Sequence, residues 1–357
     1  MKLFGKKSNS VRRSGLAAVA AISAFGLVLA GTASAPAADP KSTGKGLVIG
    51  WSQRGISGSD WWKTLVDGGQ SEATKIGASI TVLDANGDTR QQNSDVQTLI
   101  SKGVDVVIMN PSDPIGVGPA AQALKDAGIP LVVVNSNLDP SLVPNQFCYV
   151  AEDQKGTGAL AGAEIAKKVV AKFGKSGNFK LLAIGGFPGD IISELRYSGF
   201  IKGYESVMKK YPKVKTVKLP LKYGQWKPDV ALSPIRDAAT ANPDVKIVFS
   251  MSDVMLGGIT QGLKTAGVFN NVLIGSYDGG MAAIKQMIAS PKGPLQGIAS
   301  NQPWDQGATA VKMALAAYNK DAAQCPGKVK FIKTSLITPA NAKTYYKPED
   351  TYVRAAE

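Results

Sequence analysis

The stretch that decides the fold is residues 244–280, DVKIVFSMSDVMLGGITQGLKTAGVFNNVLIGSYDGG, whose apolar pattern predicts a strand, a helix and a second strand. Asp253 and Asp278 directly follow the two predicted strands. In an open parallel sheet, groups just past the carboxyl ends of the strands line the crevice where ligands bind. The stretch therefore predicts an α/β sheet with two carboxylates beside a ligand site.

A second stretch repeats this pattern about 140 residues earlier. It covers residues 105–137 and reads DVVIMNPSDPIGVGPAAQALKDAGIPLVVVNSN. Its first predicted strand is also followed by Ser-Asp, and its segment QALKDAG matches QGLKTAG in the later stretch. The two related units predict two lobes, with the ligand between them.

Strands and helices alternate from about residue 46 almost to the end, which is typical of parallel sheets covered on both faces. Besides the stretches already quoted, the apolar pattern predicts strands at residues 47–51, 80–83, 180–184, 214–219, 295–300 and 329–332. The second lobe has its full set of units before the chain ends, so we expect the helix at residues 304–318 to return to the first lobe.

The expected fold is therefore two Rossmann-like lobes joined by a hinge of three crossovers, near residues 152, 301 and 333. The N-terminal lobe is expected to comprise residues 46–151 and 302–333. The C-terminal lobe and tail are expected to comprise residues 152–301 and 334–357. Residues 36–45 form a polar linker ahead of the first lobe.

The first 35 residues have the pattern of a secretory signal. Basic residues precede the apolar run of residues 16–30, and Ala33-Ser34-Ala35 supplies small residues for cleavage after Ala35. The apolar run is too short to predict a membrane span. We therefore expect an exported protein.

The charge and residue usage exclude several classes of function. The formal charge is +14, of which the signal carries five, so the remaining chain carries +9. Its lysines and arginines are scattered along the chain, and no basic cluster has aromatic residues interleaved with it. We therefore expect no nucleic-acid partner. Histidine is absent, which excludes histidine-dependent nucleophiles and the commonest transition-metal ligand. We also expect no metal and no cofactor.

Cys148 and Cys325 are the only cysteines. An oxidising compartment would permit a disulfide, but two buried free thiols are also common, and the sequence leaves both alternatives open.

Six motifs in order resemble those of a known family, the type I periplasmic sugar-binding proteins of ABC importers, which includes ribose and galactose binders and is related to the sensor lobes of LacI-type repressors. The motifs are DWWKTLVDGGQSEATKIGASITVLDANGD, GVDVVIMNPSD, AGIPLVVVNS, ELRYSGF, ANPDVKIVFSMSD and IGSYDGG. The resemblance covers residues 46–338. It implies a monomeric periplasmic protein that binds a sugar or sugar alcohol, delivers it to a membrane ABC permease and catalyses no reaction.

Two other functions remain open on the residues alone, and a third is disfavoured. The same lobes could report to a chemoreceptor. Asp253 and Asp278 could act as the paired carboxylates of a glycosidase. A sugar-responsive DNA-binding regulator would need a helix-turn-helix where this chain has its signal.

The aromatic candidates follow from the chemistry of a sugar, which presents apolar C–H faces as well as hydroxyl groups. Trp61 and Trp62 match the paired aromatics of the family's N-terminal lobe, although the helical spacing of Trp62 equally predicts core packing. Trp226 matches an aromatic of the second lobe. We expect Trp61 and Trp226 to stack on the ligand.

The polar candidates include several departures from the family pattern. Asp278 is expected either to bind the ligand or to cap the helix after it, and Asp253 equally to bind or to cap. Ser252 stands where the family has Asn, and Glu194 falls on the position of a sugar-contacting Arg, with Arg196 nearby. The remaining candidates are Asn135, which with Ser136 replaces the Asp-Arg of ribose binders, and the hinge residues Asn301 and Gln302. These departures point to another pentose, a hexose or a polyol.

Overall fold

The computed structural model describes residues 43–355. The predicted secretory signal and most of the predicted linker lie outside these residues. Within the described part of the chain, no helix is long and apolar enough to cross a membrane.

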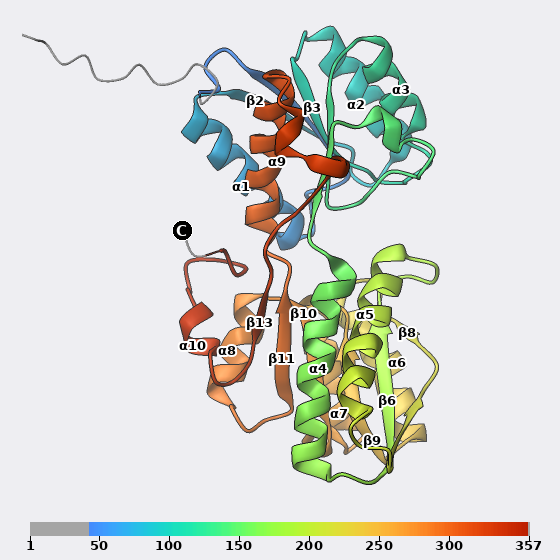
Figure 1. Cartoon of the computed structure of the whole chain (residues 1–357). Helices are drawn as coiled ribbons and strands as arrows, with labels where there is room; N and C mark the ends of the chain where they lie inside the picture. The colour runs from blue at the N-terminus through green and yellow to red at the C-terminus, as the bar shows by residue number, and fades with distance from the viewer. Residues whose placement is uncertain (1–42, 356–357) are drawn as a thin grey trace, which may run out of the picture. The chain divides into compact units, whose positions relative to one another are not determined.

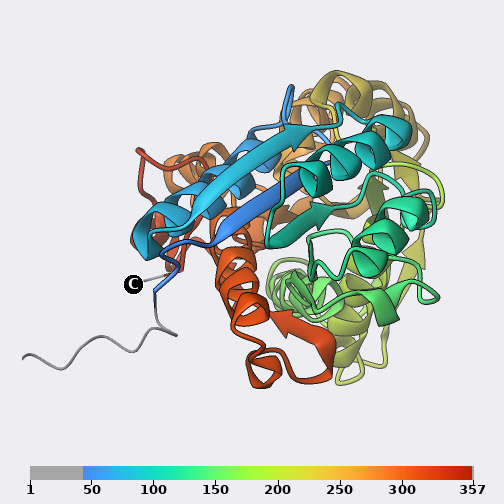
Figure 2. The same cartoon turned by 90° about the horizontal axis from the view of Figure 1, so that it is seen from above.

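The N-terminal lobe is built on a parallel six-stranded sheet in the order β12-β5-β4-β3-β1-β2. Its strands are β1 (Val48–Gln53), β2 (Ser79–Asp84), β3 (Val106–Asn110), β4 (Leu131–Val134), β5 (Cys148–Ala151) and β12 (Val329–Phe331). Its helices are α1 (Asp60–Ile76), α2 (Thr89–Ser101), α3 (Gly118–Asp126) and α9 (Pro303–Tyr318). Figures 1 and 2 show α9, from late in the chain, lying beside α1.

The C-terminal lobe is built on a seven-stranded sheet in the order β13-β11-β10-β9-β6-β7, with β8 paired to β6. Its strands are β6 (Gly177–Gly185), β7 (Val214–Lys218), β8 (Lys222–Tyr223), β9 (Val245–Ser250), β10 (Leu273–Asp278), β11 (Leu295–Ser300) and β13 (Ser335–Ile337). Only β13 is antiparallel to its neighbour among the paired strands described. The helices are α4 (Gln154–Phe173), α5 (Ile191–Met208), α6 (Pro228–Ala241), α7 (Leu256–Thr265), α8 (Met281–Ala289) and α10 (Ala342–Tyr345).

Each sheet has a hydrophobic core on both faces. In the N-terminal lobe one core packs against α1 and α9 and the other against α2 and α3. In the C-terminal lobe α4 and α5 cover one face, while α6, α7 and α8 cover the other. Short 3₁₀ turns complete the connections, at Val143–Asn145, Asp253–Met255, Phe269–Asn271, Ala322–Gln324 and Pro326–Lys328. The expected α/β fold of two Rossmann-like lobes is confirmed.

The chain passes between the lobes three times, between β5 and α4, between β11 and α9, and between β12 and β13. Each passage leaves a sheet from the carboxyl end of a strand. Because β5, β11 and β12 run parallel to their neighbours, the carboxyl ends of the parallel strands of both sheets lie on the side of these passages. This geometry brings the strand-end residues of the two lobes toward one region.

Cys148 and Cys325 form a disulfide. Of the two alternatives that the sequence left open, the structure therefore has the paired cysteines and not two free thiols. Cys148 is the first residue of β5, and Cys325 lies just before the short strand β12, which pairs with β5. The bond therefore ties the last part of the N-terminal lobe to the strand beside it. The sequence did not predict β5, β8, β13 or α10 as elements, because such short segments carry too little periodicity.

Candidate functional site

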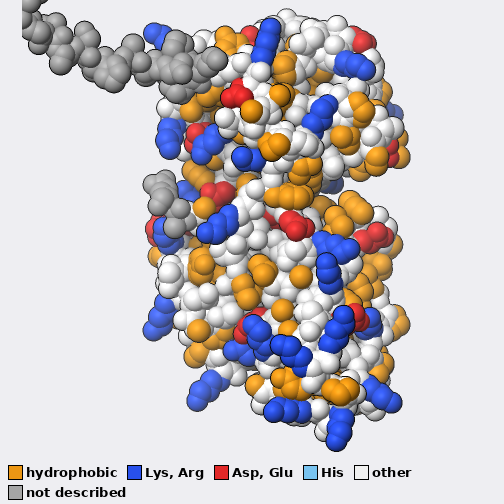
Figure 3. All heavy atoms as spheres, viewed as in Figure 1, with side chains coloured by type: hydrophobic (Ala, Val, Ile, Leu, Met, Phe, Trp, Pro, Cys, Tyr) orange, Lys and Arg blue, Asp and Glu red, His pale blue; other side chains and the backbone are white. Residues whose placement is uncertain are grey.

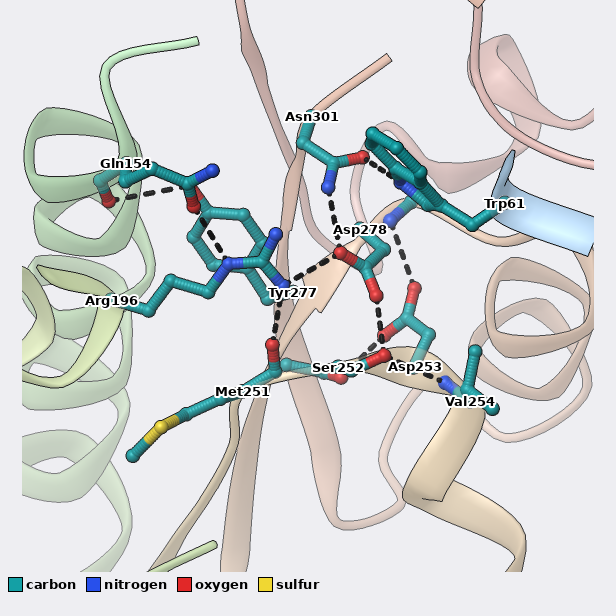
Figure 4. Close-up of polar contacts among 12 residues, drawn as sticks. Trp61, Gln154, Arg196, Met251, Ser252, Asp253, Val254, Tyr277, Asp278 and Asn301 are labelled. Atoms are coloured by element: carbon teal, nitrogen blue, oxygen red, sulfur yellow. Dashed lines mark hydrogen bonds and ion pairs between the residues drawn. The ribbon is translucent and has the colours of Figure 1, made fainter. Parts of the chain in front are cut away.

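Asp278 lies at the end of β10, in the centre of a buried polar cluster, and is only 3% exposed. Its Oδ1 accepts hydrogen bonds from Arg196 Nη1 at 2.9 Å and from Asn301 Nδ2 at 2.7 Å. Its Oδ2 accepts one from the hydroxyl of Ser252 (Figure 4). Four of the predicted site residues therefore meet in this cluster, and the carboxylate does not cap α8.

Arg196 reaches the cluster from α5, which begins after its cap Asp190. Besides Asp278, its guanidinium donates to Gln154 Oε1 at 2.7 Å and to Met251 O at 2.7 Å. It also lies 4.0 Å from the centroid of the Tyr277 ring. Burial lowers the pKa of Arg196, but Asp278, Tyr277 and Glu152 outweigh it and raise the pKa above its usual value, so the cation persists.

A hydrogen bond between Asn301 and Trp61 links the cluster to the N-terminal lobe. Asn301 Oδ1 accepts a hydrogen bond of 3.0 Å from the indole Nε1 of Trp61, which lies in the first turn of α1 (Figure 4). Ser59 caps α1 by accepting from the backbone of Trp62, which places both tryptophans at the start of that helix. Trp61 is 9% exposed, so most of its surface is already covered before any ligand binds.

Glu152 lies in the first passage between the lobes and is fully buried beside Arg196, 3.7 Å from Nη2. Its Oε2 accepts a hydrogen bond of 2.8 Å from Gln306, whose amide also donates to Asn301 O at 2.7 Å. Burial raises the pKa of Glu152 to about 7, although Arg196 acts in the opposite direction. Neither Glu152 nor Gln306 was predicted from the sequence.

Asp253 has a different role from Asp278. Its Oδ2 accepts from the backbone of Gly279 at 2.9 Å and of Gly280 at 2.8 Å, and its Oδ1 accepts from the hydroxyl of Ser276. Gly279 has a φ of +85°, which a residue with a Cβ rarely adopts. Asp253 therefore holds the turn between β10 and α8. Burial and the nearby Asp278 raise its pKa to about 8.

The strand ends of the N-terminal lobe carry polar groups that are less completely bonded. Asn135 follows β4 with a φ of +62°, and its amide donates to Asn110 Oδ1 at 3.5 Å. Asn110 Nδ2 and Ser52 Oγ are buried and have no hydrogen-bond partner among the described residues. Asn110 was missed in the sequence, although its place at the end of β3 matches that of Asp278 at the end of β10.

The remaining predicted residues differ in how they are placed. Trp226 has a φ of +56° and packs against Gly186, where an added Cβ would come within 2.0 Å of the indole. Gln302 begins α9 from a left-handed conformation, and its Oε1 is buried without a partner in the described chain. Glu194 is exposed and makes no side-chain contact with the cluster. It lies two residues from Arg196, and such neighbours point to different sides of a helix.

Trp62 is half-buried, and the guanidinium of Arg54 lies 5.2 Å from the centroid of its ring. Arg54 directly follows β1, and it was also missed in the sequence. Within residues 43–355, no group of three or more acidic or cysteine side chains is placed to hold a metal ion.

Comparison with known proteins identifies the family. The model of the periplasmic binding protein domain matches residues 49–322. The ribose import binding protein of Bacillus subtilis is 28% identical over 249 residues, which are 69% of this chain and 75% of that protein. A xylitol-binding protein of Mycolicibacterium smegmatis is 31% identical over 208 residues, 56% of this chain and 54% of that one.

Comparison with solved structures gives a similar result. A solute-binding protein of an ABC transporter from Mycobacterium smegmatis, solved with bound glycerol, superposes with a TM-score of 0.72 and 29% identity, covering 87% of this chain and 99% of that one. The chain therefore belongs to the periplasmic binding protein family, in the type I group of sugar-binding proteins of ABC importers that its motifs resemble.

Proposed function

We propose that the protein captures a neutral monosaccharide or sugar alcohol between its two lobes and delivers it to a membrane ABC permease. The observation that carries the proposal is the set of buried polar atoms without partners at the strand ends. They include Ser52 Oγ at β1, Asn110 Nδ2 at β3, Glu152 Oε1 after β5 and Gln302 Oε1 after β11. Unpaired buried polar atoms cost free energy, and a ligand that supplies hydrogen bonds would recover it.

The mixture of donors and acceptors favours hydroxyl groups as their partners. Asn110 Nδ2 can only donate, Gln302 Oε1 can only accept, and a hydroxyl group can do both. The buried carboxylate of Asp278 is already paired with Arg196, and that of Glu152 lies 3.7 Å from the same guanidinium. A neutral ligand with several hydroxyl groups fits this combination better than an ion. Names of relatives point the same way, because they include binders of ribose and xylitol.

Binding rather than catalysis is supported by how the two carboxylates are used. A glycosidase needs one carboxyl group free to protonate the leaving oxygen and another to attack or activate water. Asp278 accepts three hydrogen bonds from side chains, and Asp253 holds the turn after β10. Both are occupied by the protein itself.

We infer that the protein acts after export, in the periplasm. The predicted signal supports this inference, and so does the disulfide, because such bonds persist in oxidising compartments. Lysine and arginine side chains are dispersed over the visible face of the molecule with uncharged side chains between them, which suits a solvated surface rather than a nucleic-acid site (Figure 3).

A thermal-shift screen tests the proposal. Pentoses, hexoses, pentitols and hexitols are compared with amino acids and nucleosides on the purified mature protein. A ligand at 100 times its dissociation constant adds about 2.7 kcal/mol to the free energy of unfolding, so at least one sugar or polyol is expected to raise the melting temperature. A rise with amino acids or nucleosides alone would contradict the proposal.

Uptake of the ligand found in that screen tests delivery to a permease. Cells that lack the protein are expected to lose accumulation of the labelled ligand, and the gene restored on a plasmid should recover it. Normal uptake with a lost chemotactic response would instead assign the same lobes to a chemoreceptor.

A further inference from the structure

Arg54 is held at the strand ends of the N-terminal lobe by a well-bonded loop. Trp51 Nε1 donates to Gln53 Oε1 at 3.1 Å, and Gln53 Nε2 in turn donates to Gly55 O at 2.9 Å. The backbone carbonyl of Arg54 accepts from Gly87 N at 2.6 Å. The backbone of Arg54 is therefore fixed on both sides.

The guanidinium of Arg54 is positioned by two contacts. Its Nη1 donates to Ser136 Oγ at 3.3 Å, and its Cζ lies 5.2 Å from the ring centroid of Trp62. Gly55 makes room for the indole, because an added Cβ there would lie 3.0 Å from the Trp62 ring. The packing on Trp62 orients the plane of the guanidinium before a ligand arrives.

Most of the hydrogen-bonding capacity of Arg54 is unused. A guanidinium has five N–H donors, and in the described part of the chain only Ser136 accepts from one of them. Within residues 43–355 no carboxylate forms an ion pair with it. The side chain is half-buried, so burial lowers its pKa, although not enough to remove the charge of an arginine.

Two carboxylates act on Arg54 from a greater distance. Asp113 lies in the N-terminal lobe after β3, and Asp190 caps α5 in the C-terminal lobe. Their negative charges act to raise the pKa of Arg54, against the larger effect of burial. An anionic ligand bound to Arg54 would be repelled by these two carboxylates, which favours a neutral ligand.

We infer that Arg54 is a specificity-determining residue, which donates paired hydrogen bonds to two adjacent hydroxyl oxygens of the ligand. The inference rests on the proposed function and names the feature of the ligand that is read, a vicinal diol. The fork of N–H groups matches two acceptor oxygens side by side, and a single hydroxyl would use only half of it.

Isothermal titration calorimetry of wild type and Arg54→Ala tests this inference with the sugar or polyol that gives the largest thermal shift, and with its monodeoxy analogues. In wild type, removing either hydroxyl of one adjacent pair is expected to weaken binding at least about 10-fold. Arg54→Ala is expected to bind the parent about 10-fold to 100-fold more weakly and to discriminate little between the parent and those analogues.

The control is Arg90→Ala, because the Arg90 side chain is 95% exposed on α2. It should bind every ligand as wild type does. The inference would be overturned if Arg54→Ala bound the parent normally, or if it weakened parent and deoxy analogues by the same factor. Tighter binding of a sugar acid than of the neutral parent, lost in Arg54→Ala, would overturn the diol assignment. No shift with any sugar in wild type would instead refute the proposed function, and this inference with it.

Discussion

The polar side chains around Asp278, at the end of β10, are more completely hydrogen-bonded than those at the strand ends of the N-terminal lobe. In the C-terminal lobe, the carboxylate of Asp278 accepts from Arg196, Ser252 and Asn301, and no oxygen is left without a donor. In the N-terminal lobe, Asn110 keeps an unpaired amide nitrogen and Arg54 keeps most of its donors. The first set stabilises the fold whether or not a ligand is present. The second set has capacity that a ligand would use.

The largest expected effect comes from breaking the bonded set. Asp278→Ala leaves the buried guanidinium of Arg196 without its closest carboxylate, at 2.9 Å. Loss of one partner of a buried ion pair costs about 3–5 kcal/mol, so the ligand-free variant should unfold at a much lower urea concentration. Asp67→Ala, which breaks an exposed pair with Lys63, is the control and should cost less than about 1 kcal/mol. Similar losses in both variants would contradict the comparison.

The next effect concerns the pH dependence of stability, through Glu152. Its pKa in the folded protein is about 7, raised above that of an exposed glutamate, so the folded state holds a proton that the unfolded state has released. The stabilisation from this proton is complete at acid pH and is lost as the pH rises through 7. Relative to Glu152→Gln, wild type should lose on the order of 3 kcal/mol between pH 4 and pH 8.

Urea unfolding of both proteins across that range measures the difference, which removes the contributions of other titrating groups such as Asp253. A constant difference would mean that Glu152 stays ionised beside Arg196.

A smaller effect is expected where the two sets meet. Trp61→Phe removes the indole N–H that donates to Asn301 Oδ1 and leaves that buried oxygen without its donor. The ligand-free protein should lose about 1 kcal/mol, and affinity should fall because Asn301 is less firmly held. Trp62→Phe is the matched control for ligand-free stability, since no hydrogen bond of its indole is described. If the control lost more stability than Trp61→Phe, packing would outweigh this hydrogen bond.

The smallest change in stability is expected for the unbonded set. Asn110→Ala removes an amide whose nitrogen has no partner in the described chain and whose oxygen accepts only a long hydrogen bond of 3.5 Å from Asn135, so the ligand-free free energy of unfolding should change by less than about 1 kcal/mol. Its ligand affinity should nevertheless fall at least about 10-fold. Asn301→Ala, which removes two hydrogen bonds, should lower both stability and affinity. Equal losses of stability in Asn110→Ala and Asn301→Ala would show that the two sets of polar side chains contribute equally to the stability of the ligand-free fold.

Much of the fold could be predicted because it repeats a simple pattern. Alternating apolar strands and amphipathic helices predicted the two sheets, and the matching stretches at residues 105–137 and 244–280 predicted two lobes. Strand-end position identified Asp278 and Asn135. The same rule would have found Asn110 and Arg54, which also lie at or just after the ends of strands. Asn110 lies within the motif GVDVVIMNPSD but was not singled out as a candidate, and Arg54 lies outside the six motifs.

Other features depend on contacts between distant residues. Glu194 and Arg196 are two positions apart, and only the packing of α5 decides that Arg196 faces Asp278 while Glu194 is exposed. The pairing of Cys148 with Cys325 joins residues 177 positions apart. Local periodicity does not show which distant cysteines lie close enough to pair. It also does not show which side chain of a helix faces a residue of another element.

The sequence by itself determined the class of fold, the family and the short list of polar and aromatic candidates, because each rests on local periodicity or on motifs in order. Only the tertiary structure separated the two carboxylates of residues 244–280. Asp253 faces the backbone of the turn after β10, whereas Asp278 faces Arg196 and Asn301 from other elements. The physical reason is that a carboxylate's role depends on which donors surround it, and those donors are brought together by folding.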